Sequence, residues 1–158
     1  MPSSPLRVAV GGDHAGFPLK RLVIEWLGES AVEVLDCGTH DERSCDYPDF
    51  AVAVAKRMLA GAADRGILVC GSGVGVSVAI NKIGGMRAAI CHDTYSAHQG
   101  VEHDDMNVLC LGARVIGPEL ALEIVRSFLG ATYTPSERHA RRLEKVLRLE
   151  RFGITDSD

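Results

Sequence analysis

Short apolar runs alternate along the chain with longer segments in which apolar residues recur at helical spacing. The runs are rich in Val, Ile, Leu and Ala and lack strict alternation, which is typical of strands buried on both faces of a parallel sheet. Five strands are therefore predicted, at Leu6–Gly11, Val32–Cys37, Gly66–Cys70, Arg87–Cys91 and Asn107–Leu111.

Helices are predicted between these strands. The first leaves polar residues for solvent and repeats apolar ones at helical spacing: Lys20, Arg21, Glu25 and Glu29 against Leu19, Leu22, Val23, Trp26 and Leu27. The next three are expected over about residues 48–60, 74–82 and 94–103. A fifth opens at Gly117-Pro118, because proline suits a first helical turn, and is expected to bury Leu120, Ile124, Val125 and Phe128. This alternation predicts an α/β fold, a three-layer αβα sandwich with a Rossmann-like five-stranded parallel sheet.

A last, C-terminal helix differs from the others in its charge. Thr134-Pro135-Ser136-Glu137 reads as its start, with Ser136 as the N-cap. The helix then carries basic side chains beside an apolar docking stripe: Arg138, His139, Arg141, Arg142, Lys145, Arg148 and Arg151 with Leu143, Val146 and Leu147. The charge pattern alone leaves two interpretations open. The helix is either a solvated surface held by ion pairs or a clamp for an oxyanion, because guanidinium groups match the geometry of phosphate.

Composition narrows the class of protein. The 158 residues include 46% apolar and 24% charged residues, an ordinary globular mixture, and we expect one domain over 1–158. The net charge of −4 argues against a nucleic-acid or anionic-membrane partner. No apolar stretch approaches the roughly 20 residues that span a bilayer, and the first residues lack the apolar core of a signal peptide. A cytoplasmic protein is expected.

The five cysteines form no Cys-x-x-Cys pair, so neither a structural zinc site nor a redox dithiol is expected. An odd number of cysteines without a secretion signal indicates reduced thiols. Cys91 and Cys110 lie in apolar, strand-like runs and are interpreted as core residues.

Cys70 stands apart from these thiols, because it ends an apolar run and is followed by Gly71-Ser72-Gly73-Val74-Gly75. The glycines leave the backbone of this loop bare enough for its N–H groups to touch a ligand. Ligands of open α/β sheets bind just outside the carboxyl ends of the strands. Cys70 is therefore a candidate nucleophile or base at a binding site.

A second candidate segment, Gly11-Gly12-Asp13-His14-Ala15-Gly16, joins the first strand to the first helix. If the first and third strands are parallel neighbours, Asp13 and His14 lie at the same sheet edge as Cys70. The alternative makes Asp13 a helix cap and His14 a bystander. Weaker patterns are His103, in a polar connection where surface histidines are common, and Asp46-Tyr47-Pro48-Asp49, which reads as a turn and helix start.

Three named phosphate-binding motifs do not fit. A P-loop needs a lysine and a hydroxyl after its second glycine, where this chain has Phe17-Pro18. The cysteine phosphatase loop ends in an arginine, and that position is Val76. The dinucleotide fingerprint spaces its last glycines three apart, but Gly75 follows Gly73 by two. Asp93 does stand where a ribose-binding acid is expected, so a nucleotide-binding regulatory module remains an alternative.

Taken together, these segments resemble the ribose-5-phosphate isomerase B family, which also includes galactose-6-phosphate isomerase subunits. The resemblance spans nearly the whole chain and rests on segments in family order: Gly12-Asp13-His14-Ala15-Gly16, Asp46-Tyr47-Pro48, Cys70-Gly71-Ser72-Gly73-Val74-Gly75, Asn81-Lys82, Gly112-Ala113-Arg114 and Arg138-His139-x-Arg141-Arg142. It implies an aldose–ketose isomerase, without metal or organic cofactor, that interconverts D-ribose 5-phosphate and D-ribulose 5-phosphate in the pentose phosphate pathway.

The resemblance also implies roles for individual residues. A base moves a proton between C2 and C1 through a cis-enediolate, and that base is Cys70, because Val76 replaces the glutamate of other members. Backbone N–H groups would favour the thiolate and hold the enediolate oxygen; they belong to Ser72, Gly73, Gly75 and Val76. His103 would open the sugar ring, and Asp13 and Ser72 would bind or shuttle hydroxyl protons.

Phosphate and substrate recognition are implied for a wider set: His14, Tyr47, Gly71, Arg114, Arg138, His139 and Arg142. In the family the C-terminal arginines reach a neighbouring subunit's site. The resemblance therefore implies a homodimer, or a tetramer of two dimers, with shared active sites.

One position departs from the family. Asn usually follows the ring-opening histidine, and this chain has Asp104. An ionised carboxylate only accepts hydrogen bonds, so Asp104 either turns away or accepts from substrate hydroxyls. Other substrates (allose, galactose or tetrulose phosphates such as erythrulose phosphate) stay open for this reason. An inactive assembly subunit also stays open, because the family includes enzymes made of two obligate subunits.

Overall fold

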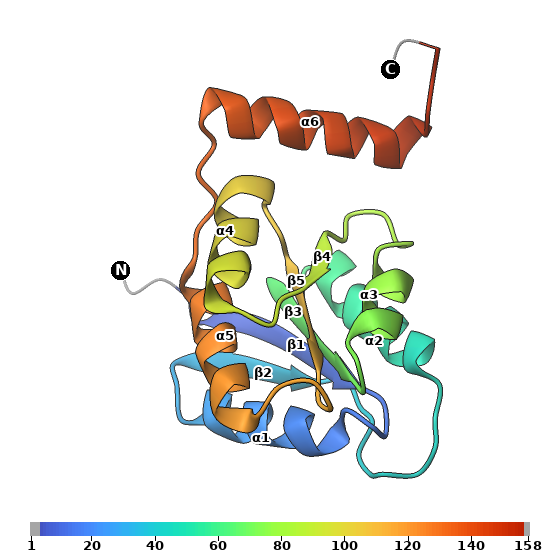
Figure 1. Ribbon diagram of the computed structural model, residues 1–158, viewed down its shortest axis with the longest axis vertical. Helices are drawn as coiled ribbons and strands as arrows, with labels where there is room; N and C mark the ends of the chain where they lie inside the picture. The colour runs from blue at the N-terminus through green and yellow to red at the C-terminus, as the bar shows by residue number, and fades with distance from the viewer. Residues whose placement is uncertain (1–3, 157–158) are drawn as a thin grey trace.

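The computed structural model describes residues 4–156 and confirms the predicted α/β fold (Figure 1). Five parallel strands form one sheet in the order β2-β1-β3-β5-β4. Their bounds are β1 Leu6–Gly12, β2 Val32–Asp36, β3 Arg65–Cys70, β4 Ala88–Ile90 and β5 Val108–Gly112. The first and third strands are neighbours, as the candidate site requires.

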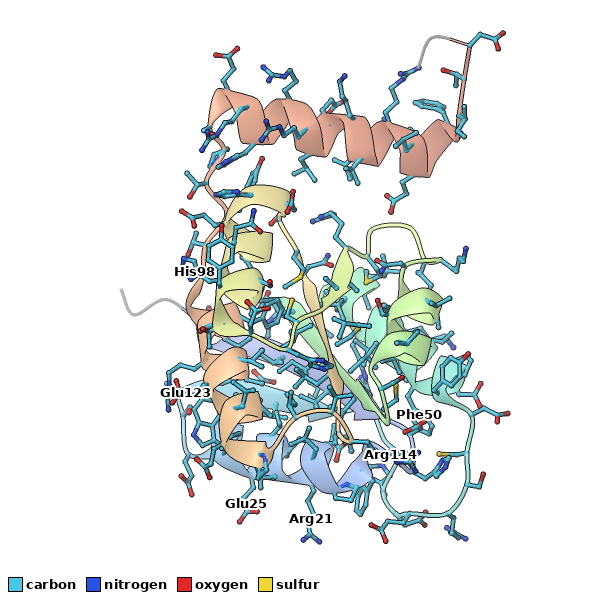
Figure 2. The ribbon with its side chains drawn as sticks, in the orientation of Figure 1. Arg21, Glu25, Phe50, His98, Arg114 and Glu123 are labelled. Atoms are coloured by element: carbon cyan, nitrogen blue, oxygen red, sulfur yellow. The ribbon has the colours of Figure 1, made fainter. Side chains whose placement is uncertain are left out.

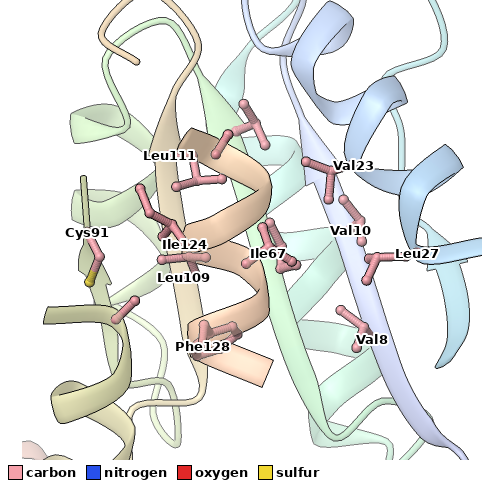
Figure 3. Packing of buried hydrophobic residues seen from close by; sticks show 14 of the residues in the cluster. Val8, Val10, Val23, Leu27, Ile67, Cys91, Leu109, Leu111, Ile124 and Phe128 are labelled. Atoms are coloured by element: carbon pink, nitrogen blue, oxygen red, sulfur yellow. The ribbon is translucent and has the colours of Figure 1, made fainter. Parts of the chain in front are cut away.

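Within residues 4–156, six helices accompany the sheet: α1 Phe17–Gly28, α2 Tyr47–Leu59, α3 Val74–Ile80, α4 Thr94–Asp104, α5 Pro118–Gly130 and α6 Glu137–Phe152. Two buried apolar clusters show which face each helix covers. One joins the sheet to α1, α4 and α5, and the other joins it to α2 and α3. In the first, Val23 and Leu27 of α1 and Ile124 and Phe128 of α5 pack over the strands (Figure 3). The strands are thus buried on both faces, which explains their unbroken apolar runs.

Two expectations about helix faces are wrong. Lys20 is only 1% exposed, and its ammonium lies 2.5 Å from Asp36 at the end of β2. A buried lysine needs such a partner, and an apolar-polar pattern cannot reveal one that lies on another element. Leu120 is exposed, and Ala121 is buried in its place, because the buried stripe of α5 passes one residue further along.

The last helix lies apart from the body of the fold. In Figure 1 α6 crosses one end of the molecule, beyond the end of α4, and α4 is the element it contacts most. Ser136 occupies the predicted N-cap position but makes no capping hydrogen bond through its side chain. Val146 and Leu149 are about half exposed, so the apolar stripe of α6 is only partly covered. No helix within residues 4–156 has the length and apolar character to cross a membrane.

Candidate active site

Cys70 is the last residue of β3, and its thiol is buried, with 4% of the residue exposed. The chain turns back at once, and the Gly73 N–H donates to Cys70 Sγ at 3.1 Å. Gly73 adopts a left-handed conformation, φ 80°, which favours glycine. The Gly73 N–H thus points at the sulfur, and its expected role at the enediolate oxygen stays a prediction.

The turn after β1 brings Asp13 and His14 beside this loop. The Asp13 N–H donates to the Val69 carbonyl at 3.2 Å, and Asp13 Oδ1 accepts from the Gly16 N–H at 2.9 Å. His14 Nδ1 accepts from the Cys45 N–H at 3.2 Å. Because Nδ1 is an acceptor, the proton of the neutral His14 ring sits on Nε2. Asp13 thus holds the turn that precedes α1, whose N-cap residue is Gly16, and both Asp13 and His14 line the cavity beside Cys70.

These segments enclose a cavity of about 390 Å³ at the carboxyl edge of the sheet. Its walls are Asp13, His14, Ala15, Tyr47, Cys70, Gly71, Ser72, Gly75, Arg114 and Val115. The register of the strands explains why these segments lie together, because the ends of β1, β3 and β5 are level: Gly12 pairs with Val69, and Cys70 pairs with Gly112. Arg114 follows β5, and its N–H donates to the Gly71 carbonyl at 2.9 Å.

The close approach of two turns at this edge depends on Gly16. A Cβ atom on Gly16 would lie 2.1 Å from the Val69 carbonyl oxygen. Gly16→Ala is therefore expected to lower the free energy of unfolding by about 3 kcal/mol, measured by urea denaturation. Gly28→Ala is the matched control, because a Cβ there meets nothing within 4 Å and alanine favours the helix by about 1 kcal/mol. Equal stability of the two variants would contradict this account.

Other predicted site residues gather in a second hollow. His103, Arg138 and His139 line a space of about 580 Å³ between α4 and the start of α6. The His103 and His139 rings are stacked, with centroids 4.0 Å apart and planes inclined by 27°. His139 is 5% exposed, and its Nδ1 lies 2.9 Å from the Thr134 carbonyl oxygen. The hollow thus combines imidazole and guanidinium groups but holds neither Cys70 nor Asp13.

The two hollows lie at opposite edges of the sheet. α4 leaves the carboxyl end of β4 and must run back before β5 begins, since these strands are parallel. Its 11 residues span about 16 Å, which carries His103 to the amino edge. Figure 2 shows Arg114 at the end of the sheet away from α6. One chain therefore does not bring Cys70 and His103 together.

Four predicted residues line neither hollow, and one of them is Gly73, whose N–H points at Cys70 Sγ. Asp104 is exposed at the end of α4 and faces a groove between α4, α6 and β4. Arg142 is exposed on α6. The Val76 side chain is fully buried in the core, although its N–H belongs to the first turn of α3, where helical amides lack a helical partner.

The chain matches the ribose/galactose isomerase family over residues 8–146. It is 46% identical to ribose-5-phosphate isomerase B of Escherichia coli, over 91% of this chain and 96% of that protein. The family is thereby settled. The chain belongs to the ribose/galactose isomerase family.

Two further relatives describe the range of this family. The structure of Clostridium thermocellum ribose-5-phosphate isomerase B has a TM-score of 0.90 and 44% identity, covering 92% of this chain and 98% of that one. D-erythrulose-4-phosphate isomerase 2 of Mycolicibacterium smegmatis is 38% identical, over 92% of this chain and 97% of that protein. The chain is accordingly an isomerase, as the sequence motifs indicated.

Two residues of this isomerase contact predicted site residues but were not predicted from the sequence. Cys45 meets His14 through its N–H and through Sγ, 3.8 Å from Nδ1. Because the two residues are 31 positions apart, no local signal joins them. Gln99 places its amide nitrogen 2.8 Å from His103 Nδ1. That contact could have been found, since residues four apart share a helix face.

Asp93 does not serve the nucleotide-binding alternative. Its Oδ1 accepts from the Ser96 N–H at 2.6 Å and caps α4. This backbone hydrogen bond lowers the pKa of the Asp93 carboxyl. The Asp93 carboxylate is already used as a helix cap, which leaves it less able to bind a ribose. The capping role accounts for an acid at this position.

The two thiols interpreted as core residues are buried, which confirms that interpretation. Burial raises the pKa of Cys91 to about 11, and burial also raises the pKa of the Cys110 thiol far above its ordinary value. Neither sulfur is a base near neutral pH. All five cysteines are free of disulfides.

Proposed function

We propose that this isomerase interconverts D-ribose 5-phosphate and D-ribulose 5-phosphate, with Cys70 as the general base. The Cys70 thiol supports this most directly, because it lines a cavity of sugar-phosphate size and its sulfur accepts a hydrogen bond from the Gly73 N–H. The similarity to the Escherichia coli enzyme supports the same substrate. A cytoplasmic location belongs to this proposal.

The chemistry proceeds from the open-chain sugar. Cys70 Sγ removes the proton on C2, the bond pair forms the C1–C2 double bond, and the C1 oxygen takes the negative charge. The first-turn amides of Gly75 and Val76, together with the Ser72 N–H, are placed to hold that oxygen. Asp13 and Ser72 move the proton of the C2 hydroxyl to the C1 oxygen. Return of the first proton to C1 completes the ketose.

The phosphate is bound by donors around the cavity mouth. The His14 ring offers Nε2–H, because Cys45 occupies its Nδ1. Arg114 contributes a guanidinium from the turn after β5, and such groups form paired hydrogen bonds with phosphate oxygens. Tyr47, whose ring lies against Gly75, forms another part of the cavity wall.

The second half of the site comes from another copy of the chain. His103, Arg138, His139 and Arg142 lie on the amino side of the sheet in their own chain, so a dimer that sets this hollow over a partner's cavity assembles the set. A groove of about 770 Å³ supports such a contact, since the apolar residues Leu143, Val146 and Leu149 of α6 line it with the open edge of β4. Exposed Val74 and Val78 on α3, beside the Cys70 loop, are suited to fill it.

In that dimer His103 opens the furanose ring. The C1–O4 bond breaks, O4 takes a proton from His103 Nε2, and the C1 hydroxyl releases a proton to water, from which His103 is reprotonated. The exposed Asp104 accepts hydrogen bonds from sugar hydroxyls. A four-carbon substrate is the second candidate, supported by the similarity to D-erythrulose-4-phosphate isomerase 2.

A substrate panel assayed with EDTA tests this function. Ribose 5-phosphate, allose 6-phosphate, galactose 6-phosphate and erythrulose 4-phosphate are compared by NMR, following exchange of the protons on C1 and C2. We expect ribose 5-phosphate to have the highest kcat/KM and EDTA to have no effect. Strict dependence on a metal would refute the mechanism, and a preference for erythrulose 4-phosphate would refute the substrate.

A further inference from the structure

Gln99 and His103 lie one turn apart on α4, on the same face of the helix. The Gln99 amide nitrogen is 2.8 Å from His103 Nδ1, which is a full hydrogen bond. Both side chains are partly buried, so the contact restricts the rotation of the imidazole. Nothing in the mechanism above uses Gln99.

This contact determines which ring nitrogen carries the proton. An amide nitrogen only donates hydrogen bonds, so Nδ1 of His103 must accept, and the proton of the neutral ring then sits on Nε2. A glutamine can also turn its amide and present oxygen to Nδ1 when the ring becomes protonated. The same side chain therefore keeps Nε2–H directed away from Gln99 in both protonation states.

The neighbouring His139 has the opposite arrangement. A carbonyl only accepts, so the 2.9 Å contact with Thr134 places the His139 proton on Nδ1. Its Nε2 accepts from Arg138 Nε at 3.3 Å. Both ring nitrogens of His139 are thus engaged within the chain. Of the two stacked rings, His103 alone has a nitrogen-bound proton to offer a ligand.

We propose that Gln99 is a positioning residue, which holds His103 as the Nε2–H tautomer facing the second hollow and so prepares it for ring opening. This inference rests on the proposed function, in which His103 acts on the ring oxygen. Residues that fix the tautomer of a catalytic or ligating histidine commonly change activity about 10-fold to 100-fold when removed.

Ring opening can be separated from proton abstraction by the choice of substrate. Ribose 5-phosphate is a furanose and must open. Ribulose 5-phosphate cannot form a furanose, because its C5 hydroxyl carries the phosphate. Exchange of its C1 proton with deuterium therefore needs Cys70 but no ring opening. A defect confined to His103 orientation should appear with ribose 5-phosphate alone.

The test compares Gln99→Met, which keeps the size but not the hydrogen bond, with Gln99→Glu, which can only accept. Gln99→Met is expected to lower ribose 5-phosphate turnover about 10-fold while C1 exchange of ribulose 5-phosphate stays near its original rate. His98→Gln is the matched control on the same helix, since His98 is exposed and pairs with Glu102, and it should change neither rate. Equal loss on both substrates would overturn the inference, because it would mean that Gln99 only supports the fold.

Nitrogen-15 NMR of the imidazoles gives a readout that needs no activity. In the original protein neutral His103 should show the Nε2–H pattern, and Gln99→Glu should convert it to Nδ1–H, with His103→Gln used to assign the signals. An unchanged tautomer in Gln99→Glu would refute the inference. If the protein turned over no pentose phosphate at all, the proposed function would fail, while the tautomer result would still decide the role of Gln99.

Discussion

Cys70→Ala is expected to lower kcat by roughly 10²–10⁴-fold, the usual contribution of a positioned general base. Exchange of carbon-bound protons should disappear in both ribose 5-phosphate and ribulose 5-phosphate. Binding of inorganic phosphate should remain, because His14 and Arg114 hold their own contacts with Cys45 and Gly71. NMR exchange and calorimetric titration with phosphate measure the two effects.

Cys91→Ala is the matched control for this prediction. Its thiol is also buried at the carboxyl side of the sheet, but burial raises its pKa to about 11, so it supplies no thiolate near neutral pH. This variant should keep its isomerase activity. If Cys70→Ala lost phosphate binding and catalysis equally, Cys70 would be a structural residue of the loop and another base would be needed.

Mixing two inactive variants is expected to restore activity. Cys70→Ala lacks the base and His103→Ala lacks the ring-opening group, and each alone should convert ribose 5-phosphate very slowly. In a mixed dimer one of the two sites receives Cys70 from one chain and His103 from the other. Equal mixing with full exchange gives half mixed dimers, so about one quarter of the original activity should return.

Exchange of subunits must be verified for this test, by native mass spectrometry of differently labelled chains. The control is the double mutant Cys70→Ala/His103→Ala mixed with the original protein. In these mixed dimers one site lacks Cys70 and the other lacks His103, so mixing should restore no activity. Verified mixed dimers without recovered activity would refute the shared site. Activity that persists undiminished far below the dimer dissociation constant would refute it as well.

The sequence predicted the sheet with little error, and it placed Cys70 and Asp13 at the edge of the sheet where the structure has them. Strand ends are local features, so the apolar run before Cys70 and the glycines after it were sufficient to place the sulfur at the carboxyl edge. The position of Asp13 followed once β1 and β3 were neighbours. The positions of these residues therefore depend mainly on the strand that each of them follows or ends.

Pairings between distant segments could not be predicted in the same way. The burial of Lys20 depends on Asp36 from another element, and the contact of Cys45 with His14 joins positions 31 apart. The separation of His103 from Cys70 follows from the direction in which α4 runs. The order of the motifs did not show that one chain carries these two groups of residues at opposite edges of the sheet, although the resemblance implied sites shared between subunits.

The strand register has a consequence for the evolution of substrate choice. Cys70 and Gly112 are paired residues of neighbouring strands in the centre of the sheet. The strand pairing therefore fixes the distance from the Cys70 sulfur to the turn that carries Arg114. In the proposed dimer, the opposite wall belongs to α6 of the other copy, and within its own chain α6 contacts mainly one helix, α4. In relatives that act on shorter or longer sugars, we therefore expect the sequence to differ first along α6. The spacing between Cys70 and Arg114 should stay the same.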